Sequence, residues 1–309
     1  MCIRDRHCDT LTECFQHGDS LYENERHLSI KRGKRYRTWF QCFAVWIPDS
    51  LRGEAAFRRF EETAEFLNHE IKEYPEKLQK CVSQEDFLLA ERNGKCGAIL
   101  TVEGGAALGG DLENVDVLAQ RGVRFLTLTW NGRCEIGDGC GVEQASGLTA
   151  FGKAALQRME RRGIVPDVSH ASDALFADAA ALAEGPLVAT HSNARRICSH
   201  LRNLTDEQFL EIRRRGGLVG LNFCPAFLRK DSENASAEDL LRHAEHFLSL
   251  GGEDVLCMGS DFDGTDMPRG IRGIESMETV AECFLRHGYS ASLVQKIFYG
   301  NAHAFFFSL

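Results

Sequence analysis

The chain has 309 residues, of which 43% are hydrophobic, and it carries a formal net charge of -9 at pH 7. This length and apolar content favour one large domain over residues 1–309, and the negative charge argues against a nucleic-acid partner, which a basic patch would normally contact. No apolar run reaches the ~20 residues of a membrane helix, so no membrane anchor is expected, and twelve cysteines without a CxxC pair predict buried thiols in a cytoplasmic protein.

The opening sequence, MCIRDR, is unusual for a protein of this composition. Only Cys2 and Ile3 are apolar where the first buried strand of an α/β domain should stand. We therefore predict a short first strand just before His7, and we predict that residues 1–6 are a non-native opening.

Apolar, β-branched runs recur along the rest of the chain and predict further strands. Between them lie helical patterns, of which the long stretch 54–93 reads as an elaborated helical connection. Ser and Thr residues stand where helices should begin, at Thr149, Ser172, Thr205 and Ser236, and the last two have Gln208 and Asp239 three residues later. With the stub before His7, the predicted strands are 38–47, 96–102, 123–129, 163–169, 186–190, 217–223 and 254–260.

Eight apolar strands alternating with helices predict a parallel sheet that is covered on its outer face. Eight such units close into a (β/α)8 TIM-like barrel of the metal-dependent hydrolase type. The second interpretation is an open doubly wound sheet, but no Gly-rich phosphate fingerprint follows any early strand.

Metal-ligand side chains follow the predicted strands where the strands end. The His-x-Asp spacing of His7 and Asp9 puts both side chains on one side of an extended segment. In a barrel, residues at the carboxyl ends of the strands share one mouth. A buried polar cluster is costly unless it has a partner, so packing alone is a poor explanation for it. The residues at this rim are His7, Asp9, Glu103, His170, His191 and Asp261.

The charges of this cluster favour two metal ions. Asp9 and Glu103 bring about two negative charges and the neutral imidazoles bring none, so two divalent ions leave a positive site that can hold hydroxide. Imidazole and carboxylate ligands without thiolate favour two Zn²⁺ per chain, with Mn²⁺ or Co²⁺ as substitutes. Glu103 is the natural bridging ligand.

In order and spacing, these motifs resemble the membrane dipeptidase (renal dipeptidase, peptidase M19) family over nearly the whole chain. The matching motifs are D-x-H-x-D at 5–9, VEG at 102–104, LTLTWN at 126–131, DVSH at 167–170, THSNAR at 190–195, Arg202 with Asn203, and GSDFDG at 259–264.

The resemblance implies a hydrolase that cleaves dipeptides, including those with a carboxyl-terminal D-residue, by a metal-bridged hydroxide. It implies one zinc ion at His7 and Asp9, another at His170 and His191, and Glu103 between them. It also implies Asp261 as the catalytic carboxylate, Arg202 as the group that binds the substrate carboxylate, and a homodimer.

One position departs from the mammalian members, which carry a histidine where this chain has Trp130. That histidine helps to stabilise the tetrahedral intermediate, and Trp130 has no charged donor to replace it. We interpret Trp130 as a wall of the substrate pocket, with Asn131 or the metals supplying the missing interaction. Two alternatives stay open, namely another metal hydrolase on the same barrel, such as an amidohydrolase or a phosphoesterase, and a family member that has lost activity.

Overall fold

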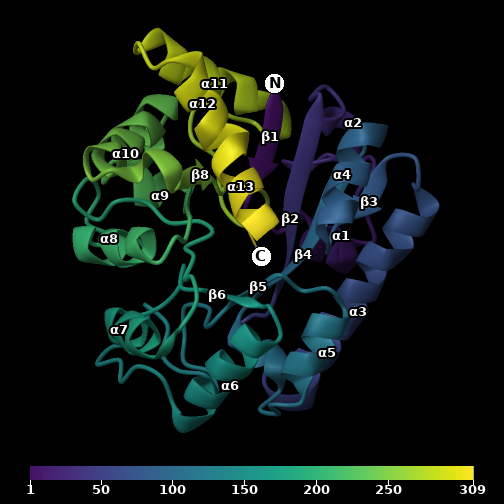
Figure 1. The fold of residues 1–309 in the computed structure, drawn as a ribbon, viewed down its shortest axis with the longest axis vertical. Helices are drawn as coiled ribbons and strands as arrows, with labels where there is room; N and C mark the ends of the chain where they lie inside the picture. The colour runs from purple at the N-terminus through teal and green to yellow at the C-terminus, as the bar shows by residue number, and fades with distance from the viewer. Residues whose placement is uncertain (309) are drawn as a thin grey trace.

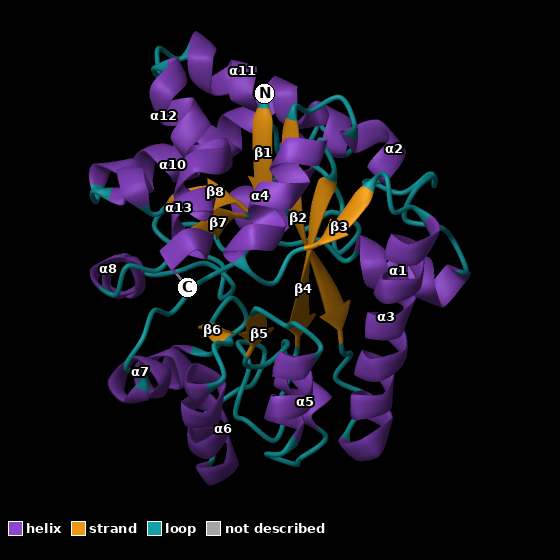
Figure 2. Cartoon of the chain, turned by 45° about the vertical axis from the view of Figure 1, so that its right-hand side comes forward, coloured by secondary structure: helices purple, strands orange, loops and turns teal. Residues whose placement is uncertain are grey.

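The computed structural model describes residues 1–308 and has a curled, all-parallel β-sheet at its centre (Figures 1 and 2). Its strands follow the order β6-β5-β4-β2-β1-β8-β7, and β3 pairs with β4 off this path. The strands are β1 (Cys2–Asp5), β2 (Thr38–Trp46), β3 (Leu78–Lys80), β4 (Cys96–Glu103), β5 (Phe125–Thr127), β6 (Val165–Asp167), β7 (Val219–Leu221) and β8 (Leu256–Met258).

The predicted strand at 186–190 is not a regular strand, which corrects one element of the prediction. The segment forms one isolated β-bridge with the strand on each side. Val188 pairs with Asp167 of β6, and Ala189 pairs with Val219 of β7. The Ala189 amide also donates to the Leu218 carbonyl at 2.9 Å. The sheet is thus a curled half-barrel whose open side is spanned by these contacts, and a TIM-like barrel is consistent with it.

The stretch 54–93 contains a strand that we did not predict. It folds as α3 (Gly53–Glu73), then β3, then α4 (Gln84–Asn93). Leu78 is buried, whereas Gln79 and Lys80 are partly exposed, so the sequence of β3 contains no apolar run by which the strand could be predicted.

Helices surround the sheet in Figure 1, and several begin at the predicted residues. The side chains of Thr149, Ser172 and Thr205 each accept a hydrogen bond from a backbone N–H of the first turn, and capping boxes form at Thr205 and Ser236. The remaining helices are α1 (Thr10–His17), α2 (Ile30–Gly33), α5 (Asn114–Gln120), α6 (Ala150–Arg161), α7 (Asp173–Leu182), α8 (Asp206–Arg214), α9 (Pro225–Leu228), α10 (Ala237–Ser249), α11 (Met277–Arg286), α12 (Ala291–Gln295) and α13 (Asn301–Ser308). Short 3₁₀ turns span Gly105–Leu108, Ser232–Asn234, Gly252–Asp254 and Ile274–Ser276, and a π turn spans Lys296–Gly300.

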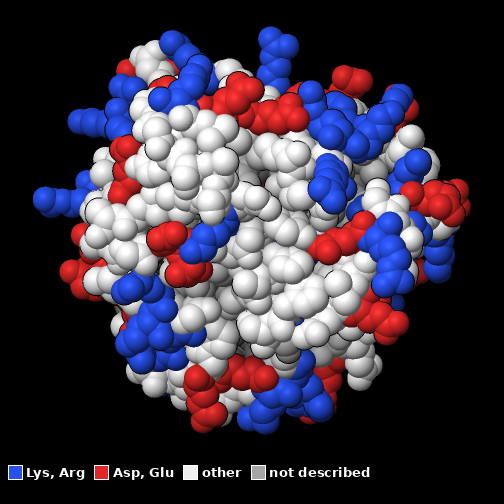
Figure 3. Space-filling model, turned by 45° about the horizontal axis from the view of Figure 1, so that its top comes forward, with Lys and Arg blue, Asp and Glu red and all other residues white. Residues whose placement is uncertain are grey.

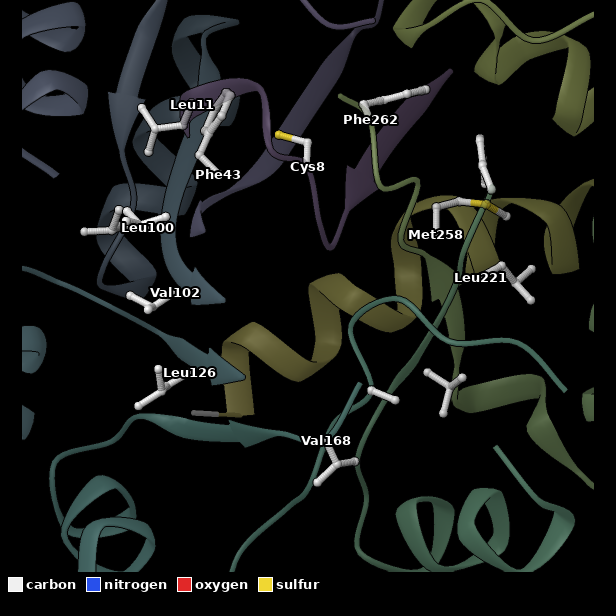
Figure 4. Packing of buried hydrophobic residues seen from close by; sticks show 14 of the residues in the cluster. Cys8, Leu11, Phe43, Leu100, Val102, Leu126, Val168, Leu221, Met258 and Phe262 are labelled. Atoms are coloured by element: carbon white, nitrogen blue, oxygen red, sulfur yellow. The ribbon is translucent and has the colours of Figure 1, made fainter. Parts of the chain in front are cut away.

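The buried apolar side chains form two clusters. The larger one includes residues of the strands and of the helices packed on them, and Figure 4 shows part of it, with Phe43, Leu100 and Met258 among the labelled residues. The smaller cluster lies near the amino ends of the strands, where α13 packs; we call it the floor. Its members include Phe40, Phe87, Phe125, Val165, Leu218, Phe305 and Phe306.

The first residues of the chain contribute to the floor. Residues Cys2–Asp5 form β1, and Arg4 and Arg6 are each 1% exposed. Arg4 lies 3.7 Å from the ring centre of Phe40, and Arg6 lies 4.2 Å from that of Phe125. That residues 1–6 are non-native stays a prediction.

The surface of the described chain carries charges of both signs. On the face seen in Figure 3, Lys and Arg side chains are interspersed with Asp and Glu around an uncharged area. Within residues 1–308, no helix combines the length and apolar composition needed to cross a membrane.

Candidate metal centre

The carboxyl ends of the strands bring the six predicted residues together. His7 and Asp9 lie between β1 and α1, and Glu103 is the last residue of β4. His170 follows β6, His191 follows the bridging segment, and Asp261 follows β8. All six are buried, with none more than 8% exposed. Three groups of them have ligand atoms close enough to hold a metal ion, namely His7–Asp9–Glu103, Glu103–His170–His191 and His7–His191–Asp261.

Glu103 faces histidines on two sides. Its Oε1 lies 2.7 Å from Nε2 of His170 and 3.3 Å from Nε2 of His191. Its other oxygen, Oε2, lies 3.7 Å from Nε2 of His7. The same His7 nitrogen lies 3.4 Å from Asp9 Oδ2 and 3.8 Å from Asp261 Oδ1. Each oxygen of Glu103 therefore has its own set of nitrogen neighbours.

The charges differ on the two sides of Glu103. Burial lowers the pKa of His7, but the carboxylates of Glu103, Asp9 and Asp261 outweigh burial and raise it to about 10. Burial lowers the pKa of His170 and His191 well below the usual value, and the Arg202 guanidinium lowers both further. Burial, followed by repulsion from Asp9, raises the pKa of Glu103 well above its usual value.

The cluster is suited to divalent metal ions. His7 Nε2 and Asp9 Oδ1 are buried and have no hydrogen-bond partner among residues 1–308, which is costly unless a ligand completes them. Imidazole nitrogens and carboxylate oxygens are the donors that zinc and its neighbours in the first transition row accept. These residues fit a metal centre on the chemistry of their donors and on their unpartnered atoms.

Other side chains orient the cluster. Asn131 Oδ1 lies 2.9 Å from His170 Nδ1, and Thr190 Oγ1 lies 2.8 Å from His191 Nδ1. The Asn222 amide donates to Asp261 Oδ2 at 2.9 Å, which leaves Oδ1 facing His7. Asn131, which we predict to bind substrate, thus also holds His170. Contacts of this type fix the ring orientation of metal-binding histidines.

Gly264 allows two carboxylates to approach each other. A Cβ at this position would lie 2.1 Å from Asp9 Oδ2 and 2.4 Å from Asp261 Oδ1, so any larger residue would push into the cluster. Asp261 itself has a φ of 61°, in the left-handed region that few non-glycine residues adopt. Residues in sparsely populated backbone conformations cluster at active sites.

A cavity of about 570 Å³ opens onto the cluster; we call this region the mouth. Arg202 lines it and is 5% exposed, with Nη2 2.9 Å from His170 Nε2 and with Nη1 lacking a hydrogen-bond partner in the described part of the chain. Trp130 and Asn131 also line the mouth, and the Trp130 ring packs edge-on against Trp46 at 5.1 Å between ring centres.

Trp46 and Asn222 were not among the site residues predicted from the sequence. Both stand at the carboxyl end of a predicted strand, Trp46 in 38–47 and Asn222 in 217–223. The rule that identified the histidines would have found them, had we applied it to residues that are not metal ligands.

A curled parallel sheet with buried imidazoles and carboxylates converging at its carboxyl end defines a metal-dependent hydrolase. Similarity to known proteins identifies the family within this class. The model of the membrane dipeptidase family, peptidase family M19, matches residues 1–305. The chain belongs to this family.

Similar proteins with solved structures agree with this assignment. The crystal structure of dipeptidase AC, a metallopeptidase, superposes with a TM-score of 0.93 at 29% identity, covering 99% of this chain and 98% of that one. A metallopeptidase from Rhodobacter sphaeroides, liganded with a phosphinate mimic of the dipeptide L-Ala-D-Ala, superposes with a TM-score of 0.92 at 27% identity over the same shares.

A fungal relative is also named as a dipeptidase. Dipeptidase tcpJ of Claviceps purpurea (strain 20.1) is 28% identical over 285 residues, which are 88% of this chain and 66% of the relative. The family match, the metallopeptidase structures and this relative together identify the chain as a metallo-dipeptidase, a hydrolase of peptide bonds.

Proposed function

We propose that the chain hydrolyses dipeptides with two Zn²⁺ ions in the mouth, bridged by Glu103. His7 and Asp9 would hold one ion, and His170 and His191 the other. The observation that carries this proposal is the orientation of Glu103, because Oε1 faces one pair of histidines and Oε2 faces His7. When bound, such ions lower the pKa of a coordinated water towards ~7 and polarise the scissile carbonyl.

Asp261 would move the proton in this reaction. Its Oδ2 is engaged by Asn222, so Oδ1 is the oxygen available to take a proton from the attacking water. The same atom then returns the proton to the leaving nitrogen as the peptide C–N bond breaks. This role requires that Asp261 act as a proton carrier and not as a metal ligand, although its oxygen also lies near His7 and His191.

Arg202 would bind the substrate carboxylate. Its guanidinium is buried, its Nη1 has no partner among the described residues, and a planar fork of donors suits a carboxylate. A buried cation near the metal ligands would hold the carboxyl end of a substrate one residue beyond the scissile bond. This arrangement favours dipeptides over longer peptides, whose carboxylate lies farther from that bond.

We propose that the enzyme also accepts a D-residue at the carboxyl end of the substrate. The related metallopeptidase from Rhodobacter sphaeroides, which is liganded with a mimic of L-Ala-D-Ala, supports this extension. Trp130 and Trp46 would form one wall of the substrate pocket, with Asn131 beside them.

Two further proposals concern the whole chain. We propose that residues 186–190 serve as the missing strand of a closed (β/α)8 barrel, because the segment bridges both β6 and β7. A cytoplasmic location is supported by the cysteines, which are all unpaired and mostly buried. A homodimer stays a prediction.

The proposal is tested by the hydrolysis of four compounds by the zinc-loaded enzyme: L-Ala-L-Ala, L-Ala-D-Ala, the amide of L-Ala-D-Ala, and the tripeptide L-Ala-L-Ala-L-Ala. We expect both free dipeptides to be cleaved, and the amide and the tripeptide to be cleaved much more slowly because neither places a carboxylate at Arg202. Cleavage of the amide at the same rate as the free dipeptide would contradict the role of Arg202. Failure to cleave any dipeptide would contradict the proposed function.

A further inference from the structure

Asp167, one residue of the D-V-S-H segment, lies beside the metal centre and has no part in the mechanism above. It is 1% exposed and accepts five hydrogen bonds. Oδ1 accepts from Ser169 N and Thr190 N at 3.0 Å and from Ser169 Oγ at 2.6 Å. Oδ2 accepts from the hydroxyls of Thr127 and Thr190, each at 2.6 Å. Two of these five donors are backbone N–H groups, which cannot accept, and the other three are hydroxyls, so both oxygens of Asp167 are fully engaged as acceptors.

The Thr190 hydroxyl connects Asp167 to His191. A hydroxyl has one proton to donate, and the carboxylate at 2.6 Å is the stronger acceptor among its neighbours. His191 Nδ1, 2.8 Å from Thr190 Oγ1, must therefore be the donor of the second hydrogen bond. With the proton on Nδ1, the lone pair of Nε2 points into the cluster, where Glu103 Oε1 lies 3.3 Å away.

His170 has a different support. Its Nδ1 faces the neutral amide oxygen of Asn131 at 2.9 Å, with no carboxylate behind the amide among the hydrogen bonds of the described residues. The two imidazoles of the same proposed metal ion thus differ at Nδ1, because among the described residues only the Nδ1 of His191 is connected, through a hydroxyl, to a buried carboxyl group. Contacts of this kind fix the tautomer and ring orientation of a metal-binding histidine.

We propose that Asp167 and Thr190 are positioning residues that hold His191 with its Nε2 lone pair facing the metal centre, and that they thereby strengthen binding of the ion shared by His170 and His191. This inference rests on the proposed two-metal function. The Nδ1–H group of His191 donates a hydrogen bond to the Thr190 hydroxyl, and this hydroxyl donates a hydrogen bond to the Asp167 carboxylate.

Asp167 also joins β5, β6 and the bridging segment, so this role has to be separated from a purely architectural one. The chain offers a matched pair for this purpose. Thr127 on β5 and Thr190 donate to the same carboxylate oxygen at the same distance, and both are buried, but only Thr190 also contacts His191. Replacing either threonine by valine removes one equivalent hydrogen bond to Asp167.

The experiment measures zinc binding by chelator competition in wild type, Thr190→Val and Thr127→Val. In Thr190→Val we expect one of the two ions to bind about 10–100-fold more weakly and the other to be unchanged. In Thr127→Val we expect both affinities to stay at the wild-type value, although each variant should lose stability in thermal unfolding of the metal-free protein because each loses a hydrogen bond to Asp167. Equal zinc affinities in Thr190→Val and wild type, or an equal loss in both variants, would overturn the inference.

A second pair keeps the test decisive if Thr190→Val does not fold. Thr190→Ala and Thr190→Ser both lack the γ-methyl group and differ only in the hydroxyl. We expect Thr190→Ser to bind zinc like the wild type and Thr190→Ala to lose affinity for one ion; equal binding by the two would overturn the proposal. Failure of the proposed function is distinguishable, because wild-type protein itself would then bind fewer than two ions.

Discussion

Two groups of buried polar atoms that have no hydrogen-bond partner within residues 1–308 lie at opposite ends of the strands. In the mouth they are His7 Nε2, Asp9 Oδ1 and Arg202 Nη1. In the floor they are Nε and Nη1 of Arg4, and Nε, Nη1 and Nη2 of Arg6. The mouth atoms include donors and acceptors, and Asp9 and Arg202 line a cavity of about 570 Å³. The floor atoms all belong to cations, which lie against the rings of Phe40 and Phe125.

This difference shows when a buried, unpartnered atom indicates a binding site. In the mouth, groups of opposite charge converge around a space that an ion or substrate can fill, so a ligand can recover the lost hydration. In the floor, aromatic faces return only part of that cost through cation–π contacts. Unpartnered atoms in the mouth therefore predict function, whereas those in the floor predict instability.

The largest effect is expected in the mouth, at Asp261. We expect Asp261→Asn to lower kcat by about 10²–10⁴-fold, the usual contribution of a general acid–base residue. Metal content should stay at the wild-type level, because the residue is proposed to move a proton and not to hold metal. Steady-state kinetics together with elemental analysis check both points. Loss of metal in parallel with activity would instead make Asp261 a ligand.

Glu13 provides the control for this substitution. It lines the same cavity, but its carboxylate is paired with Arg26 at 2.8 Å and is 28% exposed. A partly exposed ion pair contributes at most about 1 kcal/mol to folding stability. Glu13 has no proposed role in metal binding or proton transfer, so Glu13→Gln should leave kcat close to the wild-type value.

A smaller loss is expected at Arg202, where the effect should fall on substrate binding. Removing one partner of a buried charge pair costs at least about 2 kcal/mol, so Arg202→Ala should raise KM by about 30-fold or more. The exposed Arg196→Ala is the control and should leave KM unchanged. The expected KM increase should vanish with a dipeptide amide, which has no carboxylate; a KM increase of the same size for the amide would assign Arg202 a different role.

In the floor, replacing a buried polar side chain is expected to be favourable, because it should raise the free energy of unfolding. Arg6→Met keeps most of the side-chain volume and removes a buried charge without partners, so the free energy of unfolding should rise by about 1–4 kcal/mol. Arg4→Met should gain less, because Arg4 Nη2 is hydrogen-bonded to Glu91 and His303. Denaturant unfolding of both variants measures the difference. A loss of stability in Arg6→Met would remove the contrast between floor and mouth, and would count against residues 1–6 being non-native.

The smallest expected effect is the release of a proton when metal binds. Because neighbouring carboxylates outweigh burial and raise the pKa of His7 to about 10, the metal-free protein holds a proton there at pH 8. A metal-bound imidazole is neutral, so metal binding at pH 8 should release at least one proton per chain. Metal affinity should therefore rise with pH and level off above about pH 10. Calorimetry in two buffers of different ionisation enthalpy measures the release, and a binding heat independent of buffer would contradict it.

Much of the fold was predictable because its signals are local. Apolar runs located β2 and β4, and Thr149, Ser172, Thr205 and Ser236 marked helix starts, since a cap depends on a few neighbouring residues. The three-residue strand β3 and the single bridges of 186–190 could not be predicted reliably. Their pairing depends on distant parts of the chain and leaves little apolar pattern.

The site was predictable to the extent that its residues end strands. His7, Glu103, His170, His191 and Asp261 follow that rule and converge in the structure. The support given to His191 by Thr190 and Asp167 could not be read from the sequence. It depends on which hydroxyls point at one carboxylate across three adjacent strand positions, and a sequence does not specify side-chain direction at that level.

The most direct test of the account is the metal content per chain, measured by elemental analysis of wild type, Glu103→Ala and the control Glu13→Ala. The account predicts two divalent ions in wild type and in Glu13→Ala, with a sharp fall in Glu103→Ala because both oxygens of Glu103 are proposed ligands. One ion or none in wild type, or a content unchanged by Glu103→Ala, would contradict a bridged two-metal centre in the mouth.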